Sequence, residues 1–421
     1  MNRILLVMPY EQYVRQAQEA GFWVVAVWDP KLATDDYLAQ VESRSDAFVL
    51  VDFDDRDAFG QVLRETARRY DVRWIYHIGR EDSMLIAGEV AEELGMALNP
   101  TEALGLLNDK LATRTLLASS GISPVRYEQA DDVHAVRGVL RDFGYPAVVK
   151  PTSLSGSRGV FLLRTPEDVD HWATLVDTFG YPGPYLVEEQ LVGPEFSVES
   201  LSYHGHHTIV GVTAKEVGSP PLFVETGHIH PAPLSAAARH DVETTVLRLL
   251  ELAGYQFGPA HTEVILTRRG PRIVESQARL GGDQIHRLVE LATGLDIESM
   301  IFTMLAGSPP PQSKPERTAR IRYLSLDPGV VTSIDGVDRA GQMEGVDEIV
   351  IPFDVGDLVP VTRDSKTRHG YLIVVGSSVA DTEWLLAEAT SHLRISTSPY
   401  DDADVVFRPE PGSLLTRGTT R

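Results

Sequence analysis

The stretch PAHTEVILTRRGPRIVESQARLGG, residues 259–282, is the most informative part of this chain for its fold. Apolar and polar residues alternate on both sides of the segment from Arg268 to Pro271, which predicts two antiparallel strands joined by a turn. Glu263 and Glu275 lie six residues either side of Arg269. A hairpin that turns there sets the two carboxylates opposite one another and can point them to one face.

Two facing carboxylates repel each other, so they favour a cation between them. Mg²⁺ is a hard ion that prefers oxygen ligands and also bridges the phosphates of ATP. Gln277 lies one pleat beyond Glu275 and can add an amide oxygen, and Arg279 continues the same face, where a guanidinium can hold a carboxylate or a developing negative charge. A surface hairpin with alternating polar residues has the same period and stays open as the alternative.

A second motif, YPAVVKPTSLSGSRGVFLL at residues 145–163, places Lys150 at the end of an apolar strand and follows it with a loop rich in Ser and Gly. Small residues such as Ser155, Gly156 and Ser157 let backbone N–H groups approach phosphate oxygens, while the lysine offsets their charge. The residue order of a Walker A loop is missing. The motif therefore indicates a phosphate clamp, with an ordinary hairpin loop as the alternative.

A third motif, PYLVEEQLVGPEFSVESL at residues 184–201, predicts two strands separated by Gly193 and Pro194. Backbone groups from Glu189 to Leu191 can read an adenine, and the carboxylate of Glu195 can accept hydrogen bonds from ribose hydroxyls. Solvated charges on a hairpin are the simpler interpretation of this segment taken alone.

Composition restricts the classes of function. The chain has 421 residues and a formal net charge of -22, with Lys and Arg outnumbered 38 to 60 by Asp and Glu. This balance argues against a protein that wraps nucleic acid, because phosphate backbones need a concentrated basic surface. The chain has no cysteine, which excludes disulfides, a thiolate nucleophile and Cys-ligated zinc. Without a signal-peptide pattern or a long apolar run, we expect cytoplasmic residence and no membrane contact.

The order of predicted elements indicates three units. The apolar runs ILLVM, FWVVAVW, AFVLV and RWIYHIG alternate with helical patterns, which predicts a parallel sheet in residues 1–100. The glycines of a dinucleotide-binding turn are absent after the first run. Beyond the proline run at residues 309–311, the segments IRYLSL, EIVIPF, LVPVT and GYLIVVG predict short strands, and a helix is expected near residues 381–393.

The chain resembles the ATP-grasp superfamily in five features that follow one another in order: Lys110, VVKP with its Ser/Gly loop, VEEQLVGPE, the Glu263 strand and ESQARLGG. The resemblance implies an α/β (α+β) ATP-grasp fold with an N-terminal open α/β domain, central and lid subdomains and a small β-rich C-terminal unit. The expected division is 1–100 for the N-terminal domain, 101–310 for the ATP-grasp domain with its lid at about 125–192, 311–400 for the C-terminal unit, and 401–421 for a flexible tail.

The same resemblance implies roles for the quoted residues. The ATP phosphates would meet Lys110, Lys150 and the loop residues Ser155, Gly156 and Ser157. The adenine would meet Glu188 and the backbone of Glu189 and Leu191, and the ribose Glu195. Two Mg²⁺ ions, with Mn²⁺ as the alternative ion, would be held by Glu263, Glu275 and Gln277, the last in place of the more usual Asn. Arg279 would stabilise a tetrahedral intermediate.

Within the superfamily, FVETGHIHPAPL at residues 223–234 is similar to the bacilysin-type L-amino acid ligases, which carry a Glu and a His three residues apart. Here these are Glu225, suited to an α-ammonium group, and His228, suited to a carboxylate or an oxyanion. Arg279 and Gly282 are expected beside the same substrate, and Lys215 is a further candidate for contact with phosphate. A loop that satisfies its own backbone is the alternative interpretation of this segment.

Three histidines in SYHGHHTIV, residues 202–210, are interpreted as a hairpin turn around Gly205 rather than a metal cluster, because no carboxylate lies nearby in the sequence.

The expected activity is an ADP-forming ligation, in which a carboxylate takes the γ-phosphate of ATP and an amine then displaces the phosphate. The expected partners are an amino acid or another small carboxylate and an amine, with a homodimer compatible with the superfamily. The alternatives are an ATP-grasp carboxylase or formyl-phosphate-type purine enzyme, a non-catalytic nucleotide-binding module, and an interaction protein with an acidic surface. The residues alone do not identify a general base for the amine.

Overall fold

The computed structural model describes residues 2–312 and 314–399. Its N-terminal part contains a parallel sheet of order β3-β2-β1-β4, which confirms the parallel pairing predicted from the alternating pattern. The elements are β1 (Asn2–Val7), α1 (Glu11–Glu19), β2 (Phe22–Trp28), α2 (Asp35–Arg44), β3 (Ala47–Leu50), α3 (Arg56–Tyr70), β4 (Trp74–His77) and α4 (Glu81–Glu93). Strand β2 is apolar throughout and β1 is apolar from Ile4 to Val7, because helices cover both faces of the sheet.

The predicted lid is a compact layer of two helices on a sheet of order β5-β8-β6-β7. Its elements are β5 (Tyr127–Ala130), α7 (Val133–Phe143), β6 (Ala147–Pro151), β7 (Phe161–Leu163), α8 (Pro166–Asp177) and β8 (Tyr185–Glu189). Trp172 and Tyr185 are fully buried in its core and contact edge to face. The Ser/Gly-rich loop connects β6 to β7, so it projects from the end of a rigid hairpin.

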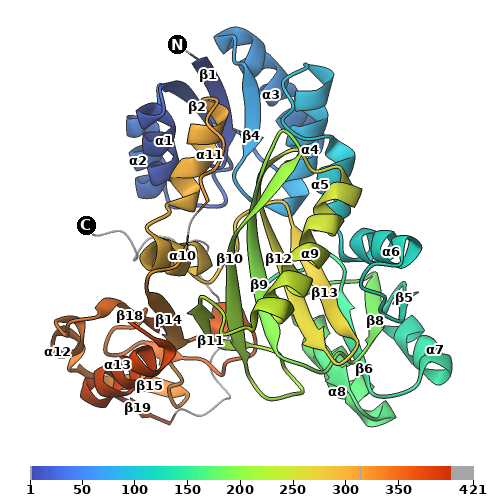
Figure 1. Ribbon diagram of the computed structural model, residues 1–421, viewed down its shortest axis with the longest axis vertical. Helices are drawn as coiled ribbons and strands as arrows, with labels where there is room; N and C mark the ends of the chain where they lie inside the picture. The colour runs from blue at the N-terminus through green and yellow to red at the C-terminus, as the bar shows by residue number, and fades with distance from the viewer. Residues whose placement is uncertain (1, 313, 400–421) are drawn as a thin grey trace.

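The central sheet has the order β13-β12-β9-β10-β11-β14-β18-β16. Its first part belongs to residues 101–310, whose elements are α5 (Thr101–Asn108), α6 (Lys110–Ser120), β9 (Glu195–Tyr203), β10 (His206–Val217), β11 (Glu225–His230), α9 (Ala236–Ala253), β12 (Phe257–Thr267), β13 (Gly270–Gln277), α10 (Ile285–Thr293) and α11 (Ile297–Leu305). Helix α9 lies over one face of the sheet in Figure 1, and its buried apolar residues pack against residues of that sheet.

Two hairpins of this sheet follow the sequence-based predictions. Strands β12 and β13 pair with Glu263 opposite Glu275. Strands β9 and β10 pair with His206 opposite Tyr203, so His204 and Gly205 form the turn between them, both in the left-handed region. Gly193 lies between β8 and β9, and a Cβ atom there would stand 2.1 Å from the carbonyl oxygen of Leu266. Close backbone contact therefore requires glycine at this break.

The C-terminal part continues the central sheet. Its elements are β14 (Thr318–Tyr323), β15 (Gly329–Asp335), α12 (Val337–Gly341), β16 (Val346–Val350), β17 (Leu358–Val359), the 3₁₀ turn η1 (Ser365–Thr367), β18 (Tyr371–Gly376), α13 (Val379–His392) and β19 (Arg394–Ser398). Strand β14 pairs with β11, placing Ile321 opposite His228. The predicted boundary near residue 310 therefore falls between strands of one sheet, and the division into domains stays a prediction.

Strands β15 and β19, which pair with each other, are absent from the sequence-based prediction. Their sequences, GVVTSID and RISTS, are short and mix apolar with polar residues, and apart from Gly329 and Val331 their residues are half-buried or exposed, so they lack the longer apolar run that marks a strand.

Helix α11 lies beside α1 although nearly 280 residues of chain separate them (Figure 1). Phe302 on α11 is fully buried and contacts the ring of Tyr13 edge to face. This apolar contact joins the N-terminal sheet to the end of the ATP-grasp segment. In residues 2–312 and 314–399 no helix combines the length and apolar character needed to cross a bilayer. The predicted flexible tail, 401–421, lies outside the described residues.

Replacing Phe302 by alanine should lower the free energy of unfolding by about 3 kcal/mol, because the change opens a cavity in a close-packed core. Urea unfolding followed by circular dichroism measures this loss. Leu252→Ala is the matched control, since Leu252 is 42% exposed, and it should change the midpoint little. Equal effects of the two substitutions would contradict the packing described for α11.

His77 at the end of β4 should make the fold sensitive to acid. Burial lowers the pKa of this imidazole to about 3, and its Nε2 lies 2.8 Å from the hydroxyl of Ser83. An unfolded chain protonates near its ordinary value of about 6.5, so this contribution to stability is present above that pH and is lost as the pH falls toward 3. The urea midpoints of unfolding at pH 7 and pH 5 should differ less in His77→Gln than in the wild-type protein. An equal difference in the two proteins would show that His77 does not cause the acid sensitivity.

Candidate active site

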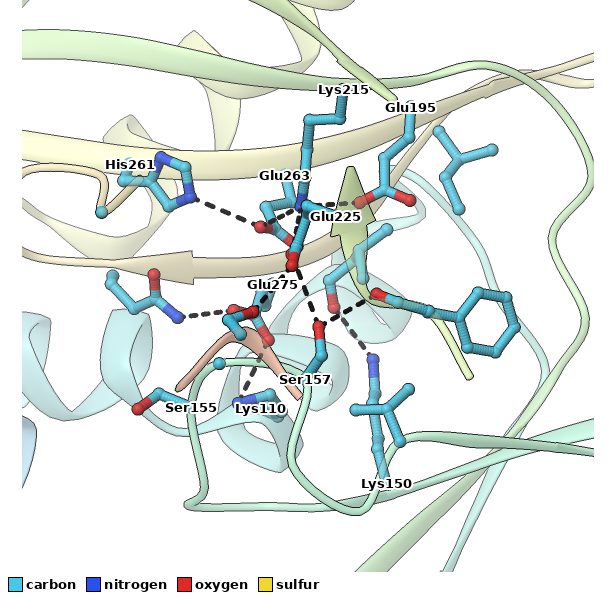
Figure 2. A pocket seen from close by; sticks show the side chains of 18 of the residues that line it. Lys110, Lys150, Ser155, Ser157, Glu195, Lys215, Glu225, His261, Glu263 and Glu275 are labelled. Carbon is cyan, nitrogen blue, oxygen red and sulfur yellow. Dashed lines mark hydrogen bonds and ion pairs between the residues drawn. The ribbon is translucent and has the colours of Figure 1, made fainter. Parts of the chain in front are cut away.

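One cavity lies between the central sheet, the lid loop and the C-terminal turn η1. Figure 2 shows its acidic and basic side chains pointing toward one another. Each residue predicted for the site lines this cavity: Lys110, Lys150, Ser155, Gly156, Ser157, Glu188, Glu189, Leu191, Glu195, Lys215, Glu225, His228, Glu263, Glu275, Gln277, Arg279 and Gly282. The structure therefore brings the whole predicted set together.

The ammonium group of Lys215 is the centre of the largest charge cluster. Its Nζ lies 2.8 Å from Glu195, 2.5 Å from Glu263 and 3.4 Å from Glu225, and its side chain is only 3% exposed (Figure 2). Burial alone would lower the pKa of Lys215, but the three carboxylates raise it well above its ordinary value. Three acids around one ammonium leave an excess of negative charge on this wall.

His261 adds a second cation beside Glu263. Its Nδ1 lies 2.6 Å from Glu199 and its Nε2 lies 3.5 Å from Glu263. Burial opposes the charged imidazole, yet Glu199 and Glu263 raise the pKa of His261 to about 10. Gly281 packs directly on this pair, and a Cβ atom there would stand 2.6 Å from Nδ1 of His261. Close contact with His261 therefore requires a glycine at position 281.

The β12–β13 hairpin supplies a second group of oxygen donors. Glu275 lies 3.1 Å from the ammonium of Lys110 and accepts a 2.6 Å hydrogen bond from the amide nitrogen of Gln277. That bond leaves the amide oxygen of Gln277 available to a ligand. Among the described residues no group of three or more His, Asp or Glu side chains is arranged as a metal site. A cation here would therefore combine Glu263, Glu275 and Gln277 with oxygens of a bound substrate, a donor set that suits Mg²⁺.

Lys150 and Glu188 form a buried ion pair that includes an arginine from α6. Glu188 lies 2.7 Å from Lys150 and 2.5 Å from Arg114, and all three side chains are buried. Burial alone would raise the pKa of Glu188, but the two cations lower it below its ordinary value. Lys150 also donates to the carbonyl of Val274. Because Arg114 also binds Glu188, Lys150 can turn toward a phosphate without leaving this carboxylate unpaired.

The Ser/Gly-rich loop contacts the C-terminal turn over the cavity. The backbone N–H of Ser365 donates to the carbonyl of Gly156 at 3.2 Å. Glu225 accepts from the hydroxyl of Ser365 at 2.8 Å and from that of Ser157 at 3.4 Å. One carboxylate of the central sheet thus joins the lid loop to the C-terminal unit.

His228 and Arg279 both line the cavity and each pairs with a carboxylate. His228 on β11 is fully buried, and its Nε2 lies 3.1 Å from Asp283. Arg279, beyond the end of β13, pairs with Glu81 at 2.8 Å. Burial alone would raise the pKa of Glu81, and Arg279 lowers it. Arg279 therefore connects the cavity to the first turn of α4 in the N-terminal unit.

Several functional candidates are absent from the sequence-based prediction: Arg114, Glu199, His261, Asp283, Ser365 and Arg368. Arg114 follows Lys110 by four residues, so helical spacing places both on one face and could have identified it. The same reasoning does not reach Ser365 and Arg368, because no local pattern in the C-terminal unit indicates which turn folds back on the cavity.

The individual roles assigned from the sequence stay predictions. Lys215 is predicted to contact phosphate, and in this structure its ammonium group binds three carboxylates. Glu188, predicted beside the adenine, is bound to Lys150 and Arg114.

Two family models match the chain. An ATP-grasp domain matches residues 143–287, which hold the lid loop and strands β12 and β13. An L-amino acid ligase C-terminal domain, called domain 2 of that family, matches residues 322–398. The second match covers the segment that carries Ser365 and Arg368.

Individual proteins agree with these matches. The chain is 28% identical over 358 residues to the uncharacterized protein y4rH of Sinorhizobium fredii, covering 84% of this chain and 74% of that protein. It is 24% identical over 241 residues to the alanine–anticapsin ligase of Bacillus subtilis, covering 52% of this chain and half (50%) of the ligase. The crystal structure of L-amino acid ligase from Bacillus licheniformis superimposes with a TM-score of 0.77 at 21% identity, covering 95% of this chain and 99% of that one.

Removing Arg114 should destabilise the fold strongly. In Arg114→Ala, the buried Glu188 keeps only Lys150, and breaking such a buried pair typically costs about 3 to 5 kcal/mol. The matched control is Arg137→Ala, because Arg137 pairs with Asp170 at the exposed surface and should lose less than about 1 kcal/mol. Chemical unfolding measures both variants, and a loss no greater in Arg114→Ala than in the control would show that the buried pair contributes little.

Proposed function

We propose that this chain, which matches an ATP-grasp domain and the C-terminal domain 2 of L-amino acid ligases, is an ADP-forming carboxylate–amine ligase. Its substrates would be amino acids or similar small molecules, joined as an amide or dipeptide through an acyl phosphate. Cytoplasmic residence and a homodimer stay predictions from the sequence.

The observation that carries the proposal is the shared cavity. Lys110, Lys150 and the loop suited to phosphate line it together with Glu225 and His228, which are suited to an amino acid, and Ser157 of the loop contacts Glu225. We infer that an amino acid bound beside Glu225 would have its carboxylate next to a γ-phosphate held by the loop. This juxtaposition is what phosphoryl transfer to a carboxylate requires, since positioning and charge dispersal provide most of the catalysis.

In the first step the substrate carboxylate attacks the γ-phosphorus, the bond to the β-phosphate oxygen breaks, and ADP leaves. Lys110, Lys150 and the backbone amides of the loop disperse the charge on the phosphates. The segment from Glu188 to Leu191 would hold the adenine and Glu195 the ribose. The loop, joined to η1 over the cavity, would exclude water from the acyl phosphate.

Mg²⁺, held by Glu263, Glu275 and Gln277, would neutralise the phosphate charge and help to orient the nucleotide. The excess of carboxylates over ammonium groups around Lys215 supports this assignment.

In the second step an amine attacks the acyl carbon, and the bond to the phosphate oxygen breaks. The guanidinium of Arg279 would stabilise the negative charge that develops on the carbonyl oxygen. Its salt bridge with Glu81 supports this role, because the bridge fixes the guanidinium at the cavity wall.

Release of ADP in the presence of ATP, Mg²⁺ and pairs of L-amino acids tests the proposal most simply. ADP should appear only when both a carboxylate and an amine are present. Release that depends on bicarbonate or formate instead would favour a carboxylase or a formyl-phosphate-type enzyme. ATP binding without ADP release across the panel would favour a nucleotide-binding module.

Glu275→Ala should reduce the rate of ADP release by about 100-fold or more, because it removes both a metal donor and the partner of Lys110. Glu344→Ala is the matched control, since Glu344 is an exposed glutamate away from the cavity. A fluorescence titration with ATP serves as the folding control, because a variant must be folded to bind the nucleotide. Wild-type turnover in a folded Glu275→Ala protein would rule out the assigned metal site.

A further inference from the structure

The C-terminal turn around η1 reaches the substrate side of the cavity. Asp364 caps it by accepting from the backbone N–H groups of Lys366 and Thr367 at 3.0 Å. This cap fixes the turn so that Ser365 and Arg368 both face the central sheet, where Ser365 binds Glu225. The turn is therefore a rigid part of the cavity wall rather than a surface loop.

Arg368 holds Asp283 with both ends of its guanidinium. Its Nη1 donates to Oδ2 of Asp283 at 2.9 Å, and its Nη2 donates to the other carboxylate oxygen. The guanidinium also stacks over the ring of Tyr323, 3.6 Å from the centroid. Burial alone would raise the pKa of Asp283, but His228 and Arg368 lower it far below its ordinary value. Asp283 is therefore an ionised acceptor with a fixed direction.

Asp283 determines which nitrogen of His228 carries a proton. The carboxylate lies 3.1 Å from Nε2 of His228, and an ionised carboxylate can only accept, so Nε2 must be the donor. The ring of Tyr323 packs edge to face against the imidazole and fixes its plane. In the neutral imidazole the lone pair is then on Nδ1.

Nδ1 of His228 has no hydrogen-bond partner. Among the cavity-lining residues of the described chain, His228 alone has a buried side-chain nitrogen or oxygen without one. A buried polar atom without a partner is costly, and a ligand in the cavity can supply the missing hydrogen bond.

We propose that Nδ1 of His228 accepts the proton of the incoming amine, and that Arg368 and Asp283 are the positioning residues that hold the Nε2 side of the ring and so direct Nδ1. The inference rests on the proposed ligase function and supplies the general base that the sequence does not identify.

The proton transfer balances with the second step. The substrate ammonium gives one proton to Nδ1 and becomes an amine, whose electron pair forms the C–N bond. The bond between the acyl carbon and the phosphate oxygen breaks, and the second proton of the nitrogen leaves with the phosphate as HPO₄²⁻. His228 returns its proton to solvent when the products leave.

The other candidates in the cavity are already bound. Glu225 is held by Lys215, Ser157 and Ser365. His261 is held between Glu199 and Glu263. Neither has an unpaired atom that could take a proton from an amine, whereas His228 has one.

Two nucleophiles separate proton transfer from the other steps. An amino acid reaches the enzyme as an ammonium ion and needs a base, whereas hydroxylamine is uncharged at neutral pH and attacks an acyl phosphate without one. The variants are His228→Gln, Arg368→Gln and the conservative Arg368→Lys. The matched control is Arg287→Gln, because Arg287 makes a similar two-pronged contact with Asp347 between α10 and the C-terminal unit, away from the cavity.

We expect His228→Gln to lower kcat for the amino-acid pair that releases ADP fastest by about 100-fold, the usual contribution of a general base. Arg368→Gln should give a smaller loss, and Arg368→Lys should restore part of it. Hydroxamate formation with hydroxylamine and the activity of Arg287→Gln should stay at the wild-type rate. Circular dichroism confirms that each variant is folded.

A loss of hydroxamate equal to the loss of amide would overturn the inference, because it places the defect before attack by the amine. A rise in KM for the amine with unchanged kcat would also overturn it, since His228 would then only bind. If the wild-type protein formed neither hydroxamate nor ADP, the proposed ligase function itself would fail, and the base assignment with it.

Discussion

The carboxylates of Glu195, Glu225 and Glu263 come from three strands and converge on the buried ammonium of Lys215, which belongs to a fourth strand between two of them. Such acids cannot be buried together without a cation, because their mutual repulsion and lost hydration would exceed the gain from packing. Lys215 offsets only part of the charge. The arrangement therefore folds as a stable site and still attracts further positive charge, which is what a site for metal-bound nucleotide needs.

Glu225 extends this cluster to the rest of the molecule. Through Ser157 it contacts the lid loop, and through Ser365 it contacts the C-terminal turn. The central sheet is continuous from β13 to β16, so the hairpin with Glu263 and Glu275 and the strands that carry the C-terminal turn form one rigid layer. A movement of the lid loop would therefore change the hydrogen bond from Ser157 to Glu225, the residue assigned to the amino acid. In the proposed reaction, phosphoryl transfer and recognition of the amino acid would therefore share the carboxylate of Glu225.

The sequence predicts what is encoded locally. The parallel N-terminal strands follow from their apolar runs, whereas the predicted pairing of Glu263 with Glu275 also depends on a β-bulge between Glu263 and Val264, which the spacing does not indicate. The cavity also contains all residues expected from the resemblance. Asp283 and Arg368 could not be predicted, because 85 residues separate them and strand pairings such as β11 with β14 and β14 with β18 bring their segments together. Their roles depend on tertiary contacts that have no sequence period.

The proposed ligation requires the transfer of phosphate from ATP to a substrate carboxylate. Labelling both carboxylate oxygens of the substrate with ¹⁸O and analysing the released phosphate by mass spectrometry tests this directly. An acyl phosphate intermediate predicts that each phosphate carries one carboxylate oxygen away when the amine displaces it, so the phosphate should contain ¹⁸O. Unlabelled phosphate released together with ADP and amide would contradict the proposed reaction.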